Sequence, residues 1–164
     1  MFLPEIDKKE TLRKTRRFFD KELDKYINLS GKHRFDLKSP IIDGLPKGSN
    51  INNNDSFMMN IFYAEQIIKC VSDAINLLTD TPKKPYKTII IDKYINCLTS
   101  QQIALKIQYS NSRTATKMNE ALLEFAQRFQ CSQKISKLEP SIKLVVYKEP
   151  LINKFGRIVK PIYD

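Results

Sequence analysis

The sequence predicts a mainly all-α fold, on three observations. Apolar residues recur at three- and four-residue spacing over several long stretches, which is the period of helices with one buried face. Only four of the 164 residues are glycine, and this low number favours helices over turn-rich sheets. Residues 98–129 also contain two adjacent helical patterns with capping residues, which together indicate a helix-turn-helix.

Composition and charge divide the chain into five ranges. We expect a basic helical segment (1–34), a linker or loop (35–54), a central helix (55–82), a helix-turn-helix DNA-binding domain (83–130) and a basic tail with a short strand or hairpin (131–164).

The first helix is expected over residues 7–29, with Asp7 as its N-cap. Its outer face carries many lysines and arginines, which either grip phosphates or form a solvated face. The solvated face is favoured, because acids follow the basic residues at helical i+3 and i+4 spacing.

Residues 30–54 break the helical pattern with three glycines, two prolines and a polar run. A short apolar anchor, made of Ile41, Ile42 and Leu45, interrupts this linker and is expected to dock on a helical domain.

Residues 56–78 return to strong helical periodicity, with an apolar band wide enough to be covered on two sides. This helix either packs beneath the helix-turn-helix or pairs with a second copy of the chain. Residues 86–97 are expected to form the helix that supports the motif, although the run Ile89–Ile91 alone also fits a buried strand. In the tail, residues 143–147 are β-prone, so a short strand or hairpin is expected there, or a partly disordered tail.

The net charge of +10 and the isoelectric point near 9.5 indicate an anionic partner. The charge is uneven, since residues 55–82 are net acidic and residues 83–130, with the helix-turn-helix, are basic. The chain has no apolar run of membrane-spanning length and no pattern of a secretion signal. We therefore expect a cytoplasmic protein without a membrane partner.

The sequence shows no pattern of an enzyme or of a cofactor or metal site. Cys70, Cys97 and Cys131 are widely spaced and are expected to be ordinary buried thiols, and His33 has no nearby ligand partner. Clustered carboxylates, a serine–histidine pair and a phosphate-cradling glycine loop are all missing.

The helix-turn-helix is predicted in detail. Thr99 and Gln102 form a capping box at the start of the first helix, and Ser110 caps the second after a short turn at residues 108–110. The first helix is expected to bury Ile103, Ala104 and Ile107. The second is expected to bury one stripe of residues: Ala115, Met118, Leu122, Phe125 and Phe129. Its first turns carry donors of the kind that contact bases and phosphates: Asn111, Ser112, Arg113, Thr116 and Lys117.

Residues 98–129, preceded by PYKTIIIDKYIN, resemble region 4 of bacterial sigma factors. More closely, most of residues 1–130 resembles the ArpU family of phage transcriptional regulators. The matching parts are MFLPEID with the following TRRFF, the central SPIIDGLPK, the helix AEQIIKCVSDAINLL, and YSNSRTATKMNEALLEFAQRF. The resemblance implies a phage or prophage protein of Gram-positive bacteria that activates late genes, including packaging and lysis functions, by binding promoter DNA.

The chain departs from that family at two positions. Gln108 stands in the turn where the family often has glycine, and a left-handed conformation there costs a non-glycine residue about 1 kcal/mol. Lys117 stands where the family tends to have an apolar residue.

These observations predict a regulator that docks the second helix in the major groove of double-stranded DNA. Arg113 is expected to make a bidentate contact to guanine, with Asn111, Ser112 and Thr116 nearby and Gln101 and Lys106 on phosphates. Host RNA polymerase and a second copy of the chain are further expected partners. The alternatives are a small terminase subunit that binds packaging DNA, and a sigma-like module that mainly contacts RNA polymerase.

Overall fold

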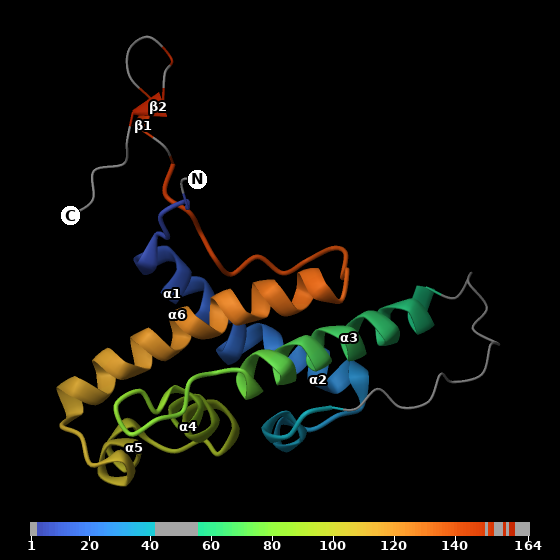
Figure 1. The fold of residues 1–164 in the computed structure, drawn as a ribbon. Coiled ribbons are helices and arrows are strands. Elements are labelled where there is room, and N and C mark those ends of the chain that lie inside the picture. The colour runs from blue at the N-terminus through green and yellow to red at the C-terminus, as the bar shows by residue number, and fades with distance from the viewer. Residues whose placement is uncertain (1–2, 42–55, 150, 153–155, 157, 160–164) are drawn as a thin grey trace.

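The chain folds as helices around one core. The computed structural model describes residues 3–41, 56–149, 151–152, 156 and 158–159. Among these residues the structure is mainly helical, as the sequence predicts. Figure 1 shows the long helix α6 (Asn111–Ile135), with α4 (Tyr86–Ile90) and α5 (Ser100–Ile107) near its N-terminal end.

The expected first helix is continuous but carries a π-helical turn. It consists of α1 (Lys8–Arg17), the π turn η1 (Phe18–Glu22) and α2 (Leu23–Ser30). Asp7 is its N-cap, as predicted, since its side chain accepts a hydrogen bond from the N–H of Glu10 at 3.1 Å. Gly31, in the left-handed conformation, ends it at φ 71°.

On the outer face of α1 and η1, basic residues pair with acids. Arg13 forms an ion pair with Glu10, and the Arg17 Nε atom lies 3.6 Å from the Glu22 Oε1 atom. These two pairs agree with the solvated face that the charge spacing favours.

After α2 the chain forms a short 3-10 helix, η2 (Arg34–Lys38), in which Leu37 is fully buried. Of the predicted apolar anchor, Ile41 packs against the core, while Ile42 and Leu45 lie outside the described residues. The central helix α3 (Ser56–Asn76) then packs against α2 and α6. The first of the two alternatives for this helix, packing with the helix-turn-helix, is therefore confirmed.

The supporting helix before the motif also exists. It comprises α4 and the π turn η3 (Ile91–Ile95), so the strand alternative for residues 89–91 is wrong. Ile89 and Ile90 are fully buried, and a helix places both against neighbouring helices.

The core gathers aromatic rings from both ends of the sequence. Phe18 and Phe19 of η1 lie against Phe125 of α6, with ring centroids 6.4 and 4.6 Å away. Phe19 also stacks on Tyr94 of η3 at 4.2 Å. The N-terminal helices and the helix-turn-helix thus share one hydrophobic core.

The buried stripe of α6 is confirmed for Leu122, Phe125 and Phe129, while Met118 is half-buried. Ala115 is exposed, so its prediction is wrong, because Thr114 takes the inward position in the first turn. On α5, Ile103 and Ala104 are buried and Ile107 is half-buried.

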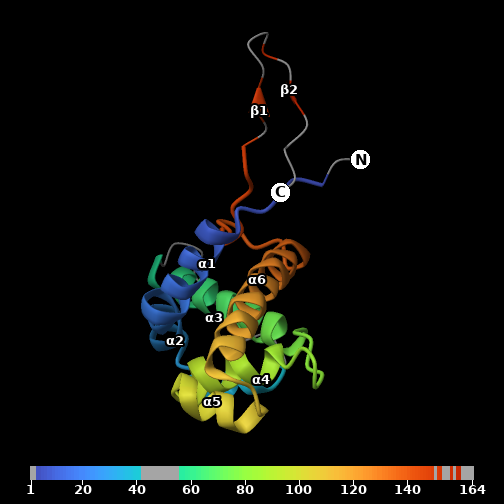
Figure 2. The same ribbon diagram turned by 90° about the vertical axis from the view of Figure 1, so that its left-hand side faces the viewer.

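The tail differs from the prediction in where its strands lie. Residues 143–147 run extended along α1 and α6 and make a single bridge, from Tyr147 to Ile6. The hairpin forms further along, where β1 (Leu151–Ile152) pairs antiparallel with β2 (Ile158–Val159). Figure 2 shows this hairpin projecting away from the helices. None of the helices in the described part of the chain is both long and apolar enough to span a membrane.

Candidate nucleic-acid interface

The start of α5 is fixed by the predicted capping box. The Thr99 hydroxyl accepts the N–H of Gln102 at 3.2 Å, and the Gln102 side chain accepts the N–H of Thr99 at 2.8 Å. Both hydrogen bonds satisfy backbone donors that a helix N-terminus leaves open. The capping residues therefore set where the two-helix motif begins.

The turn between α5 and α6 is short and left-handed. Gln108 adopts φ 60° and ψ 39°, the conformation in which glycine is the least strained residue. The N–H of Tyr109 donates back to the carbonyl of Ala104 at 3.0 Å. Ser110 then caps α6 by accepting the N–H of Arg113 at 3.2 Å, as predicted. Only three residues separate the helices, which forces them to cross sharply.

The first two turns of α6 present polar side chains to solvent. Four of the seven residues predicted to contact DNA are exposed there: Asn111, Ser112, Arg113 and Thr116. The Thr116 hydroxyl donates to the carbonyl of Ser112 at 3.2 Å. The structure therefore brings these four predicted residues together on one end of one helix.

Arg113 is held by an aromatic ring. Its guanidinium lies over the ring of Tyr109, 4.5 Å from the centroid, in a cation–π contact. The Tyr109 hydroxyl donates to the carbonyl of Pro82 at 2.6 Å and so fixes the ring. Holding a guanidinium in place lowers the entropy that it loses on binding a ligand.

Gln101 and Lys106, both on α5, differ in their surroundings. Gln101 is exposed. The Lys106 ammonium lies 3.0 and 3.1 Å from the two carboxylate oxygens of Asp92, whose residue is only 1% exposed. Asn96 donates to the same carboxylate at 2.9 Å. Lys106 thus neutralises a buried charge that links α5 to η3.

Lys117 lies apart from the exposed group. Its side chain is only 17% exposed, and its ammonium lies 3.2 Å from the Glu120 carboxylate. The Tyr86 hydroxyl donates to that carboxylate at 2.6 Å. The hydrogen bond from Tyr86, and then that from Lys117, hold the pKa of Glu120 below its usual value. Burial raises the pKa of Tyr86. Lys117, Glu120 and Tyr86 join α6 to α4.

Two residues that matter here were missed in the sequence. Tyr109 lies in the turn before α6, so helical spacing gives no signal for its contact with Arg113. Asp92 is the single acid in the apolar run IIIDKYI, and such an acid needs a cation once the run is buried.

The thiols differ from the prediction. Cys70 is buried, but Cys97 and Cys131 are exposed. Cys97 lies after η3 in a left-handed conformation, and Cys131 lies on the outer face of α6. His33 is exposed. Across the described ranges, no three side chains of metal-ligating type gather into a site.

Comparison with known proteins adds no relative. The chain matches no protein-family model, no curated protein and no solved structure. Its function must therefore be argued from its own residues.

Proposed function

We propose that the chain is a sequence-specific DNA-binding regulator that docks the start of α6 in the major groove. One observation carries the proposal: Asn111, Ser112, Arg113 and Thr116 are exposed on the first two turns of a helix whose remainder is anchored in the core. A major groove about 12 Å wide accepts such a helix.

In this proposal Arg113 makes the bidentate contact to guanine, because its fork of donors matches the two acceptors of that base. The cation–π contact with Tyr109 holds the guanidinium beside the helix start. Gln101 contacts a phosphate. Lys106 and Lys117 have intramolecular partners, Asp92 and Glu120, so a phosphate contact by either lysine competes with an ion pair.

The resemblance to the ArpU family extends this proposal to a biological role. On that basis the chain activates late genes of a phage or prophage, in the cytoplasm of the bacterial host. The net charge of +10 supports binding to DNA. Contact with host RNA polymerase and pairing with a second copy belong to the same proposal.

The test is a selection of bound sequences from randomised duplex DNA, followed by titration of the selected duplex. Arg113→Ala should weaken binding by about 1–3 kcal/mol and relax the selected sequence at one position. Arg128→Ala is the control, since it removes another exposed arginine of α6, which lies far from the first two turns and pairs with Glu124. Equal binding by wild type and Arg113→Ala would contradict the assignment.

The selection experiment and light scattering on the same protein distinguish the proposed regulator from a sigma-like module and from a small terminase subunit. A sigma-like module that acts through RNA polymerase would select no duplex, whereas the proposed regulator would. A small terminase subunit would form ring-sized oligomers in light scattering, whereas the proposed regulator is a monomer or a dimer.

A further inference from the structure

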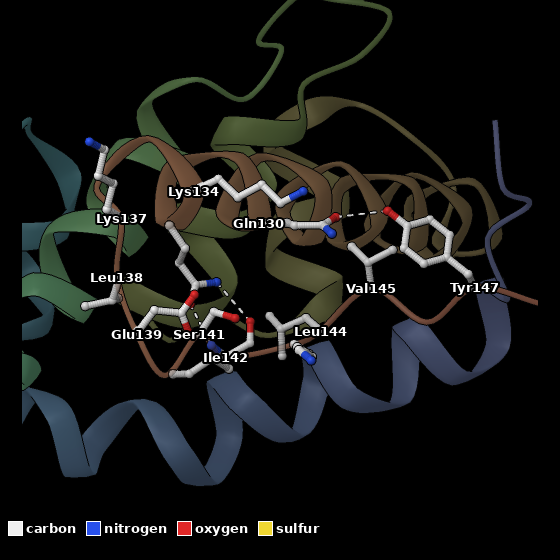
Figure 3. Close-up of a pocket in the computed structure, with 12 residues that line it drawn as sticks. Gln130, Lys134, Lys137, Leu138, Glu139, Ser141, Ile142, Leu144, Val145 and Tyr147 are labelled. Carbon is white, nitrogen blue, oxygen red and sulfur yellow. Dashed lines mark hydrogen bonds between the residues drawn. The ribbon is translucent and has the colours of Figure 1, made fainter. Parts of the chain in front are cut away.

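A groove lies at the far end of α6, away from the proposed DNA contacts. It has a volume of about 550 Å³ and is bordered by the last turns of α6 and by residues 138–147. From Arg113 to Lys134, α6 rises about 30 Å at 1.5 Å per residue. Figure 3 shows the groove with Gln130 and Tyr147 joined across one end, where the Tyr147 hydroxyl donates to Gln130 at 3.1 Å. This groove is separate from the candidate nucleic-acid interface.

One backbone edge of residues 141–147, here called the edge segment, is bonded to the protein at Ile142 and at Val146. Gln133 clamps Ile142, donating to its carbonyl at 2.9 Å and accepting its N–H at 2.6 Å. Further along, the N–H of Val146 donates to the Thr11 hydroxyl at 3.0 Å, and the carbonyl of Val146 accepts the N–H of Asp7 at 2.8 Å. These bonds hold the edge segment in an extended conformation.

The opposite backbone edge is open. In an extended chain, successive residues turn their N–H and C=O groups to opposite edges, so Lys143 and Val145 face away from the edge that Ile142 and Val146 use. Within the described part of the chain, the backbone groups of Lys143 and Val145 have no hydrogen-bond partner. An open edge of this kind is a template for an added strand.

The groove offers apolar contacts inside a basic rim. Leu144 is buried and Val145 half-buried, and both line it. The described lining residues include the lysines Lys134, Lys137 and Lys143 but only one acid, Glu139. A smaller hollow of about 190 Å³ adjoins Lys143 on the α1 side. Its charged lining residues are Arg13, Lys14, Arg17 and Glu22, of which Arg13 pairs with Glu10 and Arg17 with Glu22, so Lys14 is the added cation without an acid partner among the described ion pairs. The charge therefore favours a negatively charged occupant.

We infer that this groove binds an acidic, extended peptide segment of another protein by strand addition. The backbone of that segment pairs with Lys143 and Val145, an apolar side chain enters the groove, and its carboxylates face the lysines of the rim. This mode draws affinity from main-chain hydrogen bonds and specificity from alternate side chains.

The test uses fluorescein-labelled eight-residue peptides and the full chain, with binding followed by anisotropy. A peptide of alternating glutamate and valine should bind saturably. Three comparison peptides should each bind at least about tenfold more weakly: lysine in place of glutamate, serine in place of valine, and the original sequence with alternate backbone nitrogens methylated. Methylation removes backbone donors without changing charge, so it isolates the strand pairing.

Variants of the chain test the site itself. Lys134→Glu with Lys143→Glu should weaken the acidic peptide at least about tenfold. Lys25→Glu with Lys32→Glu is the matched control, because both lysines are exposed and lie outside the groove. Val145→Pro removes one donor of the open edge and should weaken binding similarly. If Val145→Pro does not fold, the lysine variants still decide the question.

Several results would overturn the inference. These are no saturable binding of the acidic peptide, equal binding of the methylated peptide, or the same loss in the control variant. Self-association of the chain that the Lys134→Glu and Lys143→Glu variant abolishes would assign the groove to a second copy instead.

Discussion

The two ends of α6 show how one helix serves both structure and binding. Its first two turns expose Asn111, Ser112, Arg113 and Thr116, whereas Phe125 and Phe129 are fully buried against η1. The first end therefore contributes few core contacts, and the second fixes the direction in which the first projects. Substitutions at the first end should change ligand binding, and substitutions at the second should change stability.

The largest effect is expected at the core end. Phe125→Ala removes a ring that contacts Phe18, Phe19 and Phe129, so it should lower the free energy of unfolding by about 3–5 kcal/mol. Gln127→Ala, exposed on the same part of the helix, should change it by less than about 0.5 kcal/mol. Urea unfolding measures both. Equal effects of the two substitutions would remove the distinction between the ends.

The next largest loss of stability is expected at the ion pair that joins α5 to η3. Lys106→Met leaves the buried Asp92 carboxylate without its cation and should cost about 1–3 kcal/mol of unfolding free energy. In a background of Asp92→Asn the same change should cost little, since no buried charge then needs a partner. Urea unfolding of the two single variants and the double variant gives the coupling free energy between Lys106 and Asp92. DNA binding tests a second role of Lys106. If Lys106→Met reduces the slope of the logarithm of DNA affinity against the logarithm of salt concentration by about one, Lys106 also contacts a phosphate.

A substitution in the turn between α5 and α6 should raise the free energy of unfolding, whereas the two substitutions above lower it. Gln108→Gly relieves a left-handed conformation at φ 60° and should stabilise the protein by about 1 kcal/mol. Gln127→Gly, in the helical interior of α6, should destabilise it by a similar amount. Thermal unfolding of both variants tests the pair. A loss of stability in Gln108→Gly would mean that the Gln108 side chain contributes more than its backbone strain costs.

The sequence predicts local structure well wherever a local rule applies. The caps at Asp7, Thr99 and Ser110 depend on residues three apart, so they can be found without a fold. Interactions between distant segments follow no such rule. The neutralisation of Asp92 by Lys106 and the clamp of Gln133 on Ile142 depend on how helices and the tail meet.

At the candidate site, too, local sequence patterns and contacts between distant segments lead to different results. Helical periodicity defines the buried face of α6 only to within a fraction of a turn, so it predicts that Ala115 is buried, whereas the structure buries Thr114 instead. Lys117 carries the charge expected of a DNA contact, but its ion pair with Glu120 also depends on Tyr86, which is 34 residues away from Glu120 in sequence. Residue type predicted the chemistry, and tertiary contacts decided which side chains are free for it.

The smallest effect is expected at the Lys117, Glu120 and Tyr86 cluster, which lies between the two ends of α6. Because the folded-state pKa of Glu120 is lowered, its carboxylate stabilises the fold above the unfolded pKa of about 4.3, and this stabilisation is lost as pH falls through the lower folded value. Glu120→Gln should therefore be less stable than wild type at pH 7, and the gap should close on acidification below about pH 4. Urea unfolding at several pH values measures the gap, with Glu149→Gln, an exposed acid, as the control. A gap that persists at low pH would show that the amide disrupts packing rather than the charge-assisted hydrogen bonds. A gap that closes would show that this cluster joins α6 to α4 electrostatically, unlike the aromatic contacts at the core end.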